Sequence, residues 1–378
     1  MSRVQLKGMT WGHPRGYDPM IACSRIWLEQ TGVEIVWDKR SLQDFESFPV
    51  EQLARQYDLI VIDHPHVGEI TAQACLTPLD VEGRETERDQ LAASSIGGSY
   101  ASYTWQGRQW AFPIDAAAQV QAWRPDLVDR APPSWGGVLD LARQGRVMIP
   151  MRPPHSLMSF YTLAANLGTP CAIEGPGDLI ASAHGEAVYD LLADLVGLCQ
   201  ADCFEMDPIA VMERMSQADG GIASAPLIYG YVNYGIDGFR DRRLEFDDIP
   251  VAGSHGPVGS ALGGTGIAVS AFGAEREAAI DFAYWIASGA VQRGPFGQAG
   301  GQPGHAAGWE DEALNAATNG FYQNTRATLD NAWVRPRHRG YMAFQDAASQ
   351  RLNAGLMAGE AGAAVVADIN RMFARSFG

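Results

Sequence analysis

Lysine is almost missing from this chain of 378 residues, in which only Lys7 and Lys39 occur. No GxxxxGK[ST] phosphate loop is present, which excludes P-loop nucleotide hydrolysis. A Schiff-base enzyme would have to use one of two lysines near the N-terminus, so that chemistry is not expected. Acidic residues outnumber basic ones 44 to 28 and the formal charge is −16. This balance argues against binding to nucleic acid or to an anionic membrane.

Long apolar runs, repeats and paired cysteines are lacking too. No apolar run approaches the ~20 residues that span a bilayer. The five cysteines are odd in number and form no CxxC pair, so a disulfide framework is not indicated. Cys199 and Cys203 lie four residues apart and are expected to be two free thiols of one helix face. We expect neither a metal nor a cofactor.

What is present suits a globular protein with large cores, since 46% of the residues are hydrophobic and the length allows two domains. The first hundred residues alternate between strand and helix patterns. Strands are predicted over 4–10, 33–37 and 58–63, and a helix over 20–31, which Gly32 ends. This order implies a parallel sheet with crossover helices.

A second α/β pattern follows. Extended segments are predicted over 108–115 and 119–123. Ser134 and Ser156 are each expected to cap a helix, and further helices are expected over 184–201, 208–217 and 275–288. Short strands are expected over 221–224 and, after a glycine turn, up to Ser270, and the C-terminal segment is expected to be helical. We therefore predict an α/β fold of two lobes, each a mainly parallel sheet flanked by helices.

Four motifs strengthen this interpretation. They are GRQWAFPID at 107–115, PPSWGGVLDLAR at 132–143, GGTGIAVSAFGAEREAAIDFAYWI at 263–286 and GGQPG at 300–304. In order and spacing the chain resembles the solute-binding proteins of ABC importers, in the extracellular family that includes maltose- and other sugar-binding proteins. The resemblance implies the two-lobed periplasmic-binding fold. Lobe 1 would comprise 1–113 and 259–308, lobe 2 would comprise 114–258 and 309–378, and the ligand cleft would lie between them.

In such a fold, ligands bind at the carboxyl ends of strands. The predicted elements bring a set of loop residues to those ends, and His155 lies in one of these loops. The candidate ligand-binding residues are Trp11, His13, Arg15, Asp63, His64, Asp115, Arg152, Ser156, Tyr229, Gly264, Thr265 and Gln302.

These residue types suit a sugar. Aromatic rings such as Trp11 and Tyr229 can cover its C–H faces, and Asp, Arg and Gln side chains can pair with its hydroxyl groups. The alternative is that aromatic residues at strand ends are simply edges of the core. Asp63 and Asp115 each end an extended run, where a carboxylate is costly without a partner. Asp63 can instead cap a helix beginning near Val67.

Two further interpretations stay open at this stage. His13, Asp63, His64 and His66 could form a zinc or iron cluster, although no metal motif supports it. Arg15 and Arg152, with the helix N-terminus at Ser156, could instead hold an anion such as a sugar acid. Both arginines could equally pair with acidic residues of the chain.

The leading hypothesis is a monomeric binding protein that delivers a small polar solute, a sugar or sugar derivative, to an ABC permease. The resemblance implies hinge closure on the ligand and a periplasmic or cell-surface location. Met1-Ser2-Arg3 leads directly into an apolar segment with no signal-peptide pattern, so a cytoplasmic location is also considered. The alternative function is a cytoplasmic enzyme or sensor on the same fold that uses an Asp/His acid–base pair or a metal.

Overall fold

The computed structural model describes residues 4–41 and 50–378. Residues 1–3, cited above for the missing signal pattern, lie outside the described residues. The chain divides into two compact units, which are described separately: unit 1 is Met1–Ala117 with Gly263–Ala316, and unit 2 is Ala118–Leu262 with Ala317–Gly378. The chain therefore crosses between the units three times. The lobe boundaries expected from the sequence stay a prediction, because a compact unit is not by itself a ligand-binding lobe.

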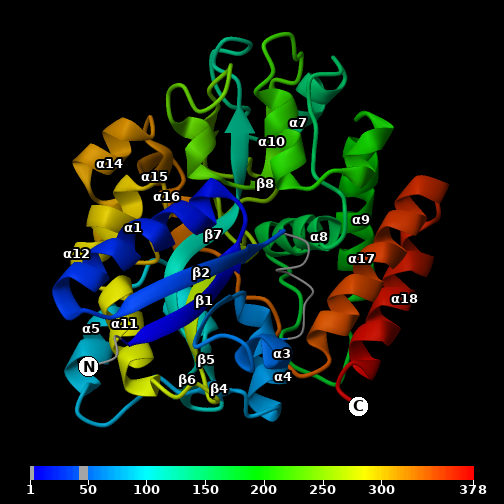
Figure 1. Cartoon of the computed structure of the whole chain (residues 1–378). Coiled ribbons are helices and arrows are strands. Elements are labelled where there is room, and N and C mark those ends of the chain that lie inside the picture. The colour runs from blue at the N-terminus through cyan, green and yellow to red at the C-terminus, as the bar shows by residue number, and fades with distance from the viewer. Residues whose placement is uncertain (1–3, 42–49) are drawn as a thin grey trace. The chain divides into compact units, whose positions relative to one another are not determined.

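Unit 1 is built on a sheet in the order β2-β1-β3-β10. The strands are β1 (Gln5–Trp11), β2 (Glu34–Arg40), β3 (Leu59–Ile62) and β10 (Leu262–Ser270). β1 pairs in parallel with both β2 and β3, and the long β1–β2 contact is visible in Figure 1. β10 runs antiparallel to β3 and carries a further short strand, β4 (Leu76–Thr77).

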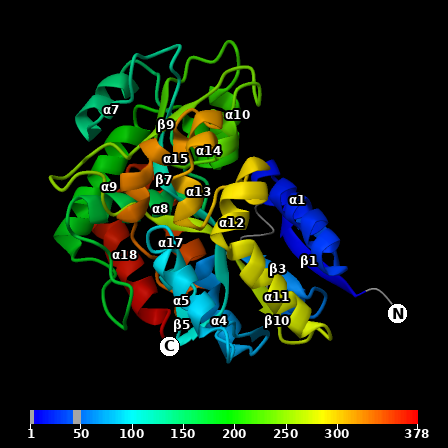
Figure 2. The same cartoon turned by 90° about the vertical axis from the view of Figure 1, so that its left-hand side faces the viewer.

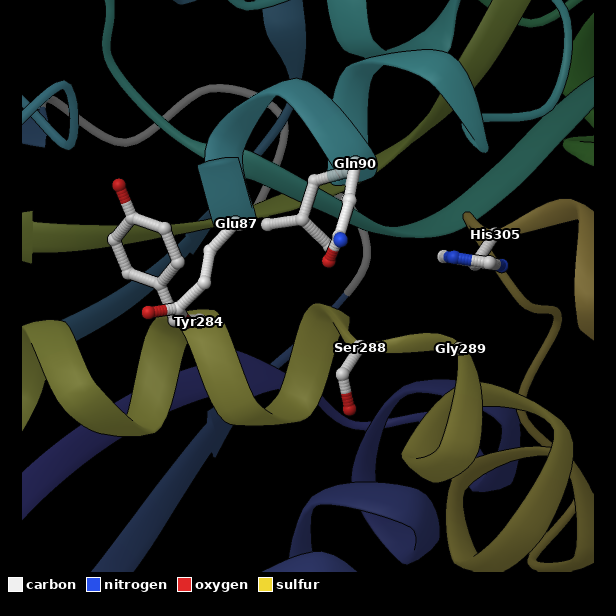
Figure 3. A pocket seen from close by; sticks show the side chains of 7 residues that line it. Glu87, Gln90, Tyr284, Ser288, Gly289 and His305 are labelled. Carbon is white, nitrogen blue, oxygen red and sulfur yellow. The ribbon is translucent and has the colours of Figure 1, made fainter. Parts of the chain in front are cut away.

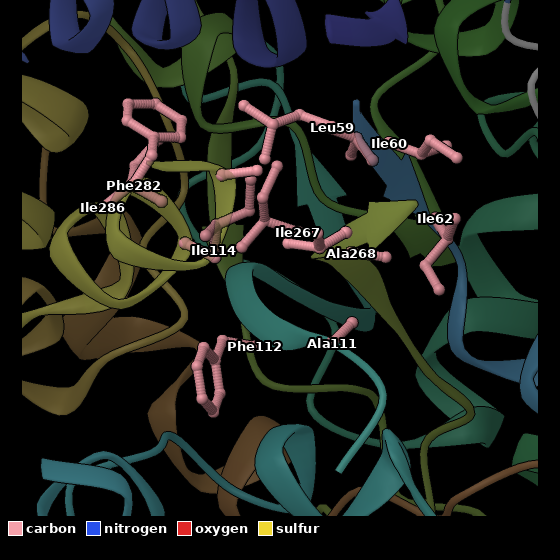
Figure 4. Close-up of a cluster of buried hydrophobic side chains, with 14 of the residues drawn as sticks. Leu59, Ile60, Ile62, Ala111, Phe112, Ile114, Ile267, Ala268, Phe282 and Ile286 are labelled. Carbon is pink, nitrogen blue, oxygen red and sulfur yellow. The ribbon is translucent and has the colours of Figure 1, made fainter. Parts of the chain in front are cut away.

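Helices cover this sheet. β3 is buried along its whole length, as expected for an apolar strand covered on both faces. Figure 4 shows its side chains beside those of β10 and of Phe282 and Ile286 from α11 (Arg276–Ala287). The other elements of unit 1 are α1 (Pro14–Thr31), α3 (Val50–Ala54), η1 (His64–His66), α4 (Val67–Ala72), α5 (Glu85–Ala93), α6 (Ser99–Ser102), β5 (Thr104–Trp105), β6 (Arg108–Gln109), α12 (Gly289–Val291), η4 (Gln292–Phe296) and α13 (Ala306–Trp309).

Helix α1 begins six residues earlier than the sequence pattern suggested, at Pro14 instead of residue 20. The loop expected there is helical because a proline at the first helical position loses no intrahelical hydrogen bond. The His13 side chain also caps the helix by accepting from the Arg15 N–H. Gly32 ends it with φ of 77°, as predicted.

Strand β7 (Phe112–Trp123) corrects another expectation. The two extended segments predicted over 108–115 and 119–123 form one buried strand of 12 residues, preceded by the short strand β6. Asp115 therefore lies inside a strand and does not end one. The proline at 113 is tolerated because it stands near the start of the strand.

In unit 2, β7 pairs antiparallel with β8 (Ser224–Tyr229) and β9 (Glu245–Asp247). The expectation of a mainly parallel sheet in this lobe was wrong. In the described residues of unit 2, parallel pairing is limited to isolated bridges such as that of Val147 with Ser224. The strand expected over 221–224 instead begins at Ser224, where the expected segment ends.

The helices of unit 2 include a C-terminal pair, α17 (Tyr341–Ala358) and α18 (Gly362–Arg375), which pack against each other. Helix α18 also packs on α9 (Ser182–Val196) (Figures 1 and 2). The helical C-terminal segment is thus confirmed. No helix within 4–41 or 50–378 combines the length and hydropathy needed to cross a bilayer. The unit's remaining elements are α7 (Trp135–Ala142), α8 (His155–Asn166), η2 (Ala201–Glu205), α10 (Pro208–Met215), η3 (Val232–Gly235), α15 (Phe321–Asn324) and α16 (Arg326–Asp330), with α14 (Glu312–Ala317) at the third crossing.

Candidate functional site

The candidate residues of unit 1 gather at one edge of its sheet. β1 ends at Trp11 and β3 ends at Ile62, and because the two strands are parallel their carboxyl ends meet at the same edge. β10 enters that edge from the opposite direction, with Gly266 paired to Ile62. We call this set the edge cluster: Trp11, His13, Arg15, Asp63, His64, Asp115, Gly264, Thr265 and Gln302.

A buried ion pair lies at the centre of the edge cluster. Arg15 and Asp115 are 4% and 1% exposed, and both nitrogens of the fork, Nε and Nη2, donate to the carboxylate. The Nε–Oδ2 distance is 2.8 Å. Burial raises the pKa of Asp115, and the Arg15 guanidinium opposes that shift by favouring the carboxylate. Of the two interpretations of Arg15, pairing with an acid of the chain is the one observed.

The first turn of α1, which contains Arg15, is packed tightly against the end of β1. The Trp11 ring lies so close to Gly16 that a Cβ there would come within 2.3 Å of the indole. The Thr10 hydroxyl donates to the Gly16 carbonyl at 2.9 Å. Trp11 is only 4% exposed, so in this structure it serves as core more than as an open face for a ligand. His13 is 8% exposed and acts as the helix cap.

Asp63 directly follows β3 and contacts His64, with 3.2 Å between Oδ1 and Nδ1. The carboxylate is 16% exposed and the imidazole is fully buried. Asp63 stands at the N-terminus of η1, yet its side chain makes no capping hydrogen bond to that turn. The helix that begins at Val67 has His66 at its capping position, so Asp63 is not its cap. The Asp63 carboxylate lies partly exposed at the sheet edge.

The remaining residues of the edge cluster come from the segment Gly263–Ala316, with which the chain re-enters unit 1. Gly264 has φ of 93°, and a Cβ there would approach the Asp115 carbonyl oxygen to 2.3 Å, so only glycine fits. Thr265 precedes Gly266, the first β10 residue of the ladder with β3, and is 6% exposed, and its hydroxyl has no hydrogen-bond partner among the described residues. Gln302 is held by Ala116, whose carbonyl accepts from its amide at 2.7 Å.

In unit 2, the start of α8 and the end of β8 bring together a second set, which we call the α8–β8 cluster: Arg152, His155, Ser156 and Tyr229. The His155 and Tyr229 rings meet edge to face, with centroids 6.1 Å apart. The His155 N–H donates to the Arg152 carbonyl at 2.8 Å. Arg152 lies 3.9 Å from a carboxylate oxygen of Asp207, so both candidate arginines face acids.

Ser156 was predicted to cap α8, and that prediction was wrong. The helix begins at His155 and Pro154 occupies the capping position. Ser156 instead lies inside the first turn with 0% exposure, and its hydroxyl has no hydrogen-bond partner in the described part of the chain. Burial lowers the pKa of His155 to about 4, so its imidazole is neutral at pH 7.

Sequence reasoning missed two buried groups that shape these clusters. The Tyr103 hydroxyl donates to the Ile62 carbonyl at 3.1 Å and its ring packs edge to face on His64. Arg335 is 4% exposed, donates to the Leu262 carbonyl, and acts electrostatically on His155. The position of Arg335 directly before Pro336 was the one sequence feature that could have indicated its role. No local sequence pattern indicates a role for Tyr103.

The metal alternative gains no support. In 4–41 and 50–378, no group of three or more His, Cys, Asp or Glu residues is arranged to hold an ion. The histidines considered for it have other roles, since His13 caps α1 and His64 contacts Asp63.

A separate pocket of about 140 Å³ lies on unit 1 between α5 and the end of α11 (Figure 3). Four of its polar side chains already have protein partners. Glu87 pairs with Arg84, Tyr284 donates to the Leu79 carbonyl, and Ser288 donates to Trp285. The His305 ring, at the other end of the pocket, accepts from the Ala307 N–H. The edge cluster is therefore the better candidate for recognition.

The fold matches that of the two-lobed periplasmic binding proteins. Maltose-bound T. maritima MalE3 aligns with a TM-score of 0.81 and 17% identity, covering 98% of this chain and 99% of that one. A solute-binding protein from Agrobacterium radiobacter K84 in complex with ribitol aligns with a TM-score of 0.77 and 18% identity, covering 98% of each chain. A solute-binding protein from Thermotoga lettingae bound with α-D-tagatose aligns with a TM-score of 0.82 and 14% identity, covering 99% of this chain and 100% of that one.

The family follows from a second finding. Residues 28–303 match the family of bacterial extracellular solute-binding proteins, and the chain belongs to that family. No curated protein matches the chain. The resemblance drawn from the four sequence motifs and the predicted fold class are both confirmed.

Proposed function

We propose that this solute-binding protein binds a neutral polyhydroxyl compound, a sugar or a sugar alcohol, and passes it to an ABC permease outside the cytoplasm. The edge cluster and the α8–β8 cluster are the proposed ligand surfaces of their respective units. The protein acts as a monomer in this proposal.

The buried Arg15–Asp115 pair carries the proposal. Its two opposite charges compensate each other, so the guanidinium is a poor anchor for a second anion. The partly exposed Asp63 carboxylate would repel a sugar acid and accept hydrogen bonds from neutral hydroxyl groups. The Thr265 hydroxyl adds a second group for such contacts. The anion interpretation of Arg15 and Arg152 is accordingly the weaker one.

The comparisons support the same class of ligand. The structures similar to this chain were solved with maltose, ribitol and tagatose, all of them uncharged polyhydroxyl compounds. An acid–base enzyme built on Asp63 and His64 is less well supported. The imidazole of His64 is fully buried, so it would have to move before exchanging a proton with a substrate.

A thermal-shift screen tests the proposal. The purified chain is heated with members of four classes: neutral sugars, sugar alcohols, sugar acids and amino acids. A compound that binds the folded protein raises its melting temperature by mass action. At a concentration 100 times Kd, binding adds about 2.7 kcal/mol to the free energy of unfolding. The proposal expects the hits among neutral sugars or sugar alcohols. Hits confined to amino acids or sugar acids would contradict it.

A further inference from the structure

One buried amide in unit 2 connects the two elements that form the α8–β8 cluster. Gln119 lies on β7 with 0% exposure. Its Nε2 donates to Ser159 Oγ at 3.1 Å, and its Oε1 accepts from Thr162 Oγ1 at 2.6 Å. Both partners lie on α8, and with His155 they are spaced at four and three residues, so all three share one face of the helix.

The same residue also fixes the strand. Gln119 stands directly opposite Tyr229 in the β7–β8 ladder. Through its side chain it therefore holds the helix that carries His155, and through its backbone it holds the residue whose ring packs on His155. A shift of either element would change the contact between the two rings.

The returning chain is tied into this network as well. Ser260 Oγ donates to the Gln119 carbonyl at 2.6 Å, and the Ala261 N–H donates to Thr162 Oγ1 at 3.0 Å. Thr162 thus uses its hydroxyl both as donor and as acceptor. Both polar ends of the buried Gln119 amide have partners. The network therefore favours this arrangement of α8 and β7 over one in which the helix slides along the strand.

We propose that Gln119 is a positioning residue, which sets α8 against β8 so that the buried His155 ring holds the partly exposed Tyr229 in place for a ligand. The proposal rests on the proposed function of the α8–β8 cluster. Gln119 itself is fully buried and acts through the elements it joins.

Gln119→Leu tests this, with Gln121→Leu as the matched control. Gln121 is two residues along the same strand, is 1% exposed and donates its amide to Ser224 Oγ at 2.9 Å. Ser224 lies at the opposite end of β8 from Tyr229. Both variants lose a buried hydrogen-bonding amide, so both are expected to melt at lower temperature. Only Gln119→Leu should disturb the α8–β8 cluster.

The first readout needs no ligand. The His155 imidazole is followed by NMR between pH 5 and 7, with Asp207, Arg152 and Arg335 as the charged groups acting on it. In the wild type and in Gln121→Leu it should stay neutral across this range, because its pKa is about 4. In Gln119→Leu the loosened contact admits water, and the imidazole should begin to titrate. Unchanged His155 behaviour in Gln119→Leu would overturn the proposal.

The second readout is affinity, measured by calorimetric titration with maltose, ribitol and D-tagatose. For whichever compound binds, Gln119→Leu should raise Kd about fivefold or more, and Gln121→Leu less than about twofold. Equal losses in the two leucine variants would assign Gln119 a purely structural role.

Two outcomes are kept apart by this design. If the wild type binds none of the three compounds, the proposed ligand class fails, and the NMR readout still decides whether Gln119 positions His155. If Gln119→Leu does not fold, Thr162→Val and Ser159→Ala each remove one bond of the network. Titration of His155 in either variant then supports the proposal, and its absence in both contradicts it.

Discussion

Single side chains at the carboxyl edge of unit 1 are held mainly by one another. Arg15 is engaged by Asp115, and Asp63 contacts His64 while keeping part of its carboxylate exposed. The edge cluster thus offers acceptors and a compensated ion pair. This inventory favours uncharged hydroxyl groups as the ligand's polar contacts.

Asp63→Ala tests the part assigned to that carboxylate. If Asp63 accepts hydrogen bonds from ligand hydroxyls, its removal costs ~1.5–3 kcal/mol of binding, or about tenfold to a hundredfold in Kd. Stability should fall less, because the buried strand behind it is unchanged. Calorimetric titration and a melting curve of the same variant separate the two effects.

Asp58→Ala is the control, since Asp58 precedes the same strand at its opposite end and accepts from the Lys7 N–H at 2.9 Å. It should lower the melting temperature and leave Kd unchanged. A variant of Asp63 that loses stability but keeps its affinity would remove Asp63 from the ligand surface.

The Arg15–Asp115 pair makes a stability prediction. Asp115→Ala leaves a buried guanidinium without its carboxylate, and breaking a buried pair in this way costs ~3–5 kcal/mol. The double change Arg15→Met with Asp115→Leu removes both charges and should recover most of that loss. Urea denaturation measures both. Equal instability of the single and double variants would mean that the loss comes from packing and not from the unpaired charge.

These residues differ in how far the sequence could reveal them. Asp63 follows an apolar run, so its place at a sheet edge was predictable from the strand alone. Arg15 and Asp115 are 100 positions apart, and only the fold brings them together. The contact between Tyr103 and His64 is likewise a product of tertiary packing, for which no local pattern exists.

At the scale of elements, the approach of β10 to β7 depends on Gly264. Gly264→Ala forces a Cβ against the Asp115 carbonyl oxygen, at 2.3 Å, with φ of 93°. The left-handed backbone and the overpacking together should destabilise the protein by about 2 kcal/mol or more. Thermal melting measures this.

Gly136→Ala serves as the comparison, because Gly136 lies in α7 and a Cβ there meets nothing within 4 Å. In an exposed helical position, alanine should stabilise by roughly 0.5–1 kcal/mol. If Gly264→Ala were tolerated equally well, the tight contact between the two strands would not exist in solution.

Helix and strand patterns predicted most elements and failed where a local signal misled. Pro19 suggested a loop before residue 20, but the capped start at Pro14 outweighs it. Ser156 has the residue type of a cap, yet Pro154 takes that position. β7 was divided in two because the small residues around Ala117 hide a strand that is buried throughout.

At the scale of the whole molecule, the charge of −16 bears on the ligand. A strongly acidic protein repels anions over long range, and salt screens that repulsion. A neutral ligand feels neither effect. We therefore expect Kd for the bound sugar or sugar alcohol to change by less than about twofold between roughly 0.02 and 0.5 M NaCl. A Kd that varies strongly with salt would indicate a charged ligand.

The overall architecture was predictable because four motifs between residues 107 and 304 follow the order and spacing of one known family. They carry no information on the ligand, since recognition depends on side chains that the fold gathers from distant segments. Antiparallel pairing in unit 2 escaped prediction for a related reason. Strand direction within a sheet follows from the path of the chain and not from the composition of a strand.

Matched pairs of a neutral compound and its acid test the central claim most directly. Glucose with glucuronate, galactose with galacturonate and ribitol with ribonate are each titrated into the protein by calorimetry. The account predicts that in any pair that binds, the neutral member binds at least about tenfold more tightly, since one charge–charge repulsion of ~1.4 kcal/mol suffices for that ratio. Tighter binding of the acid would contradict a ligand surface built on Asp63 and the compensated Arg15–Asp115 pair.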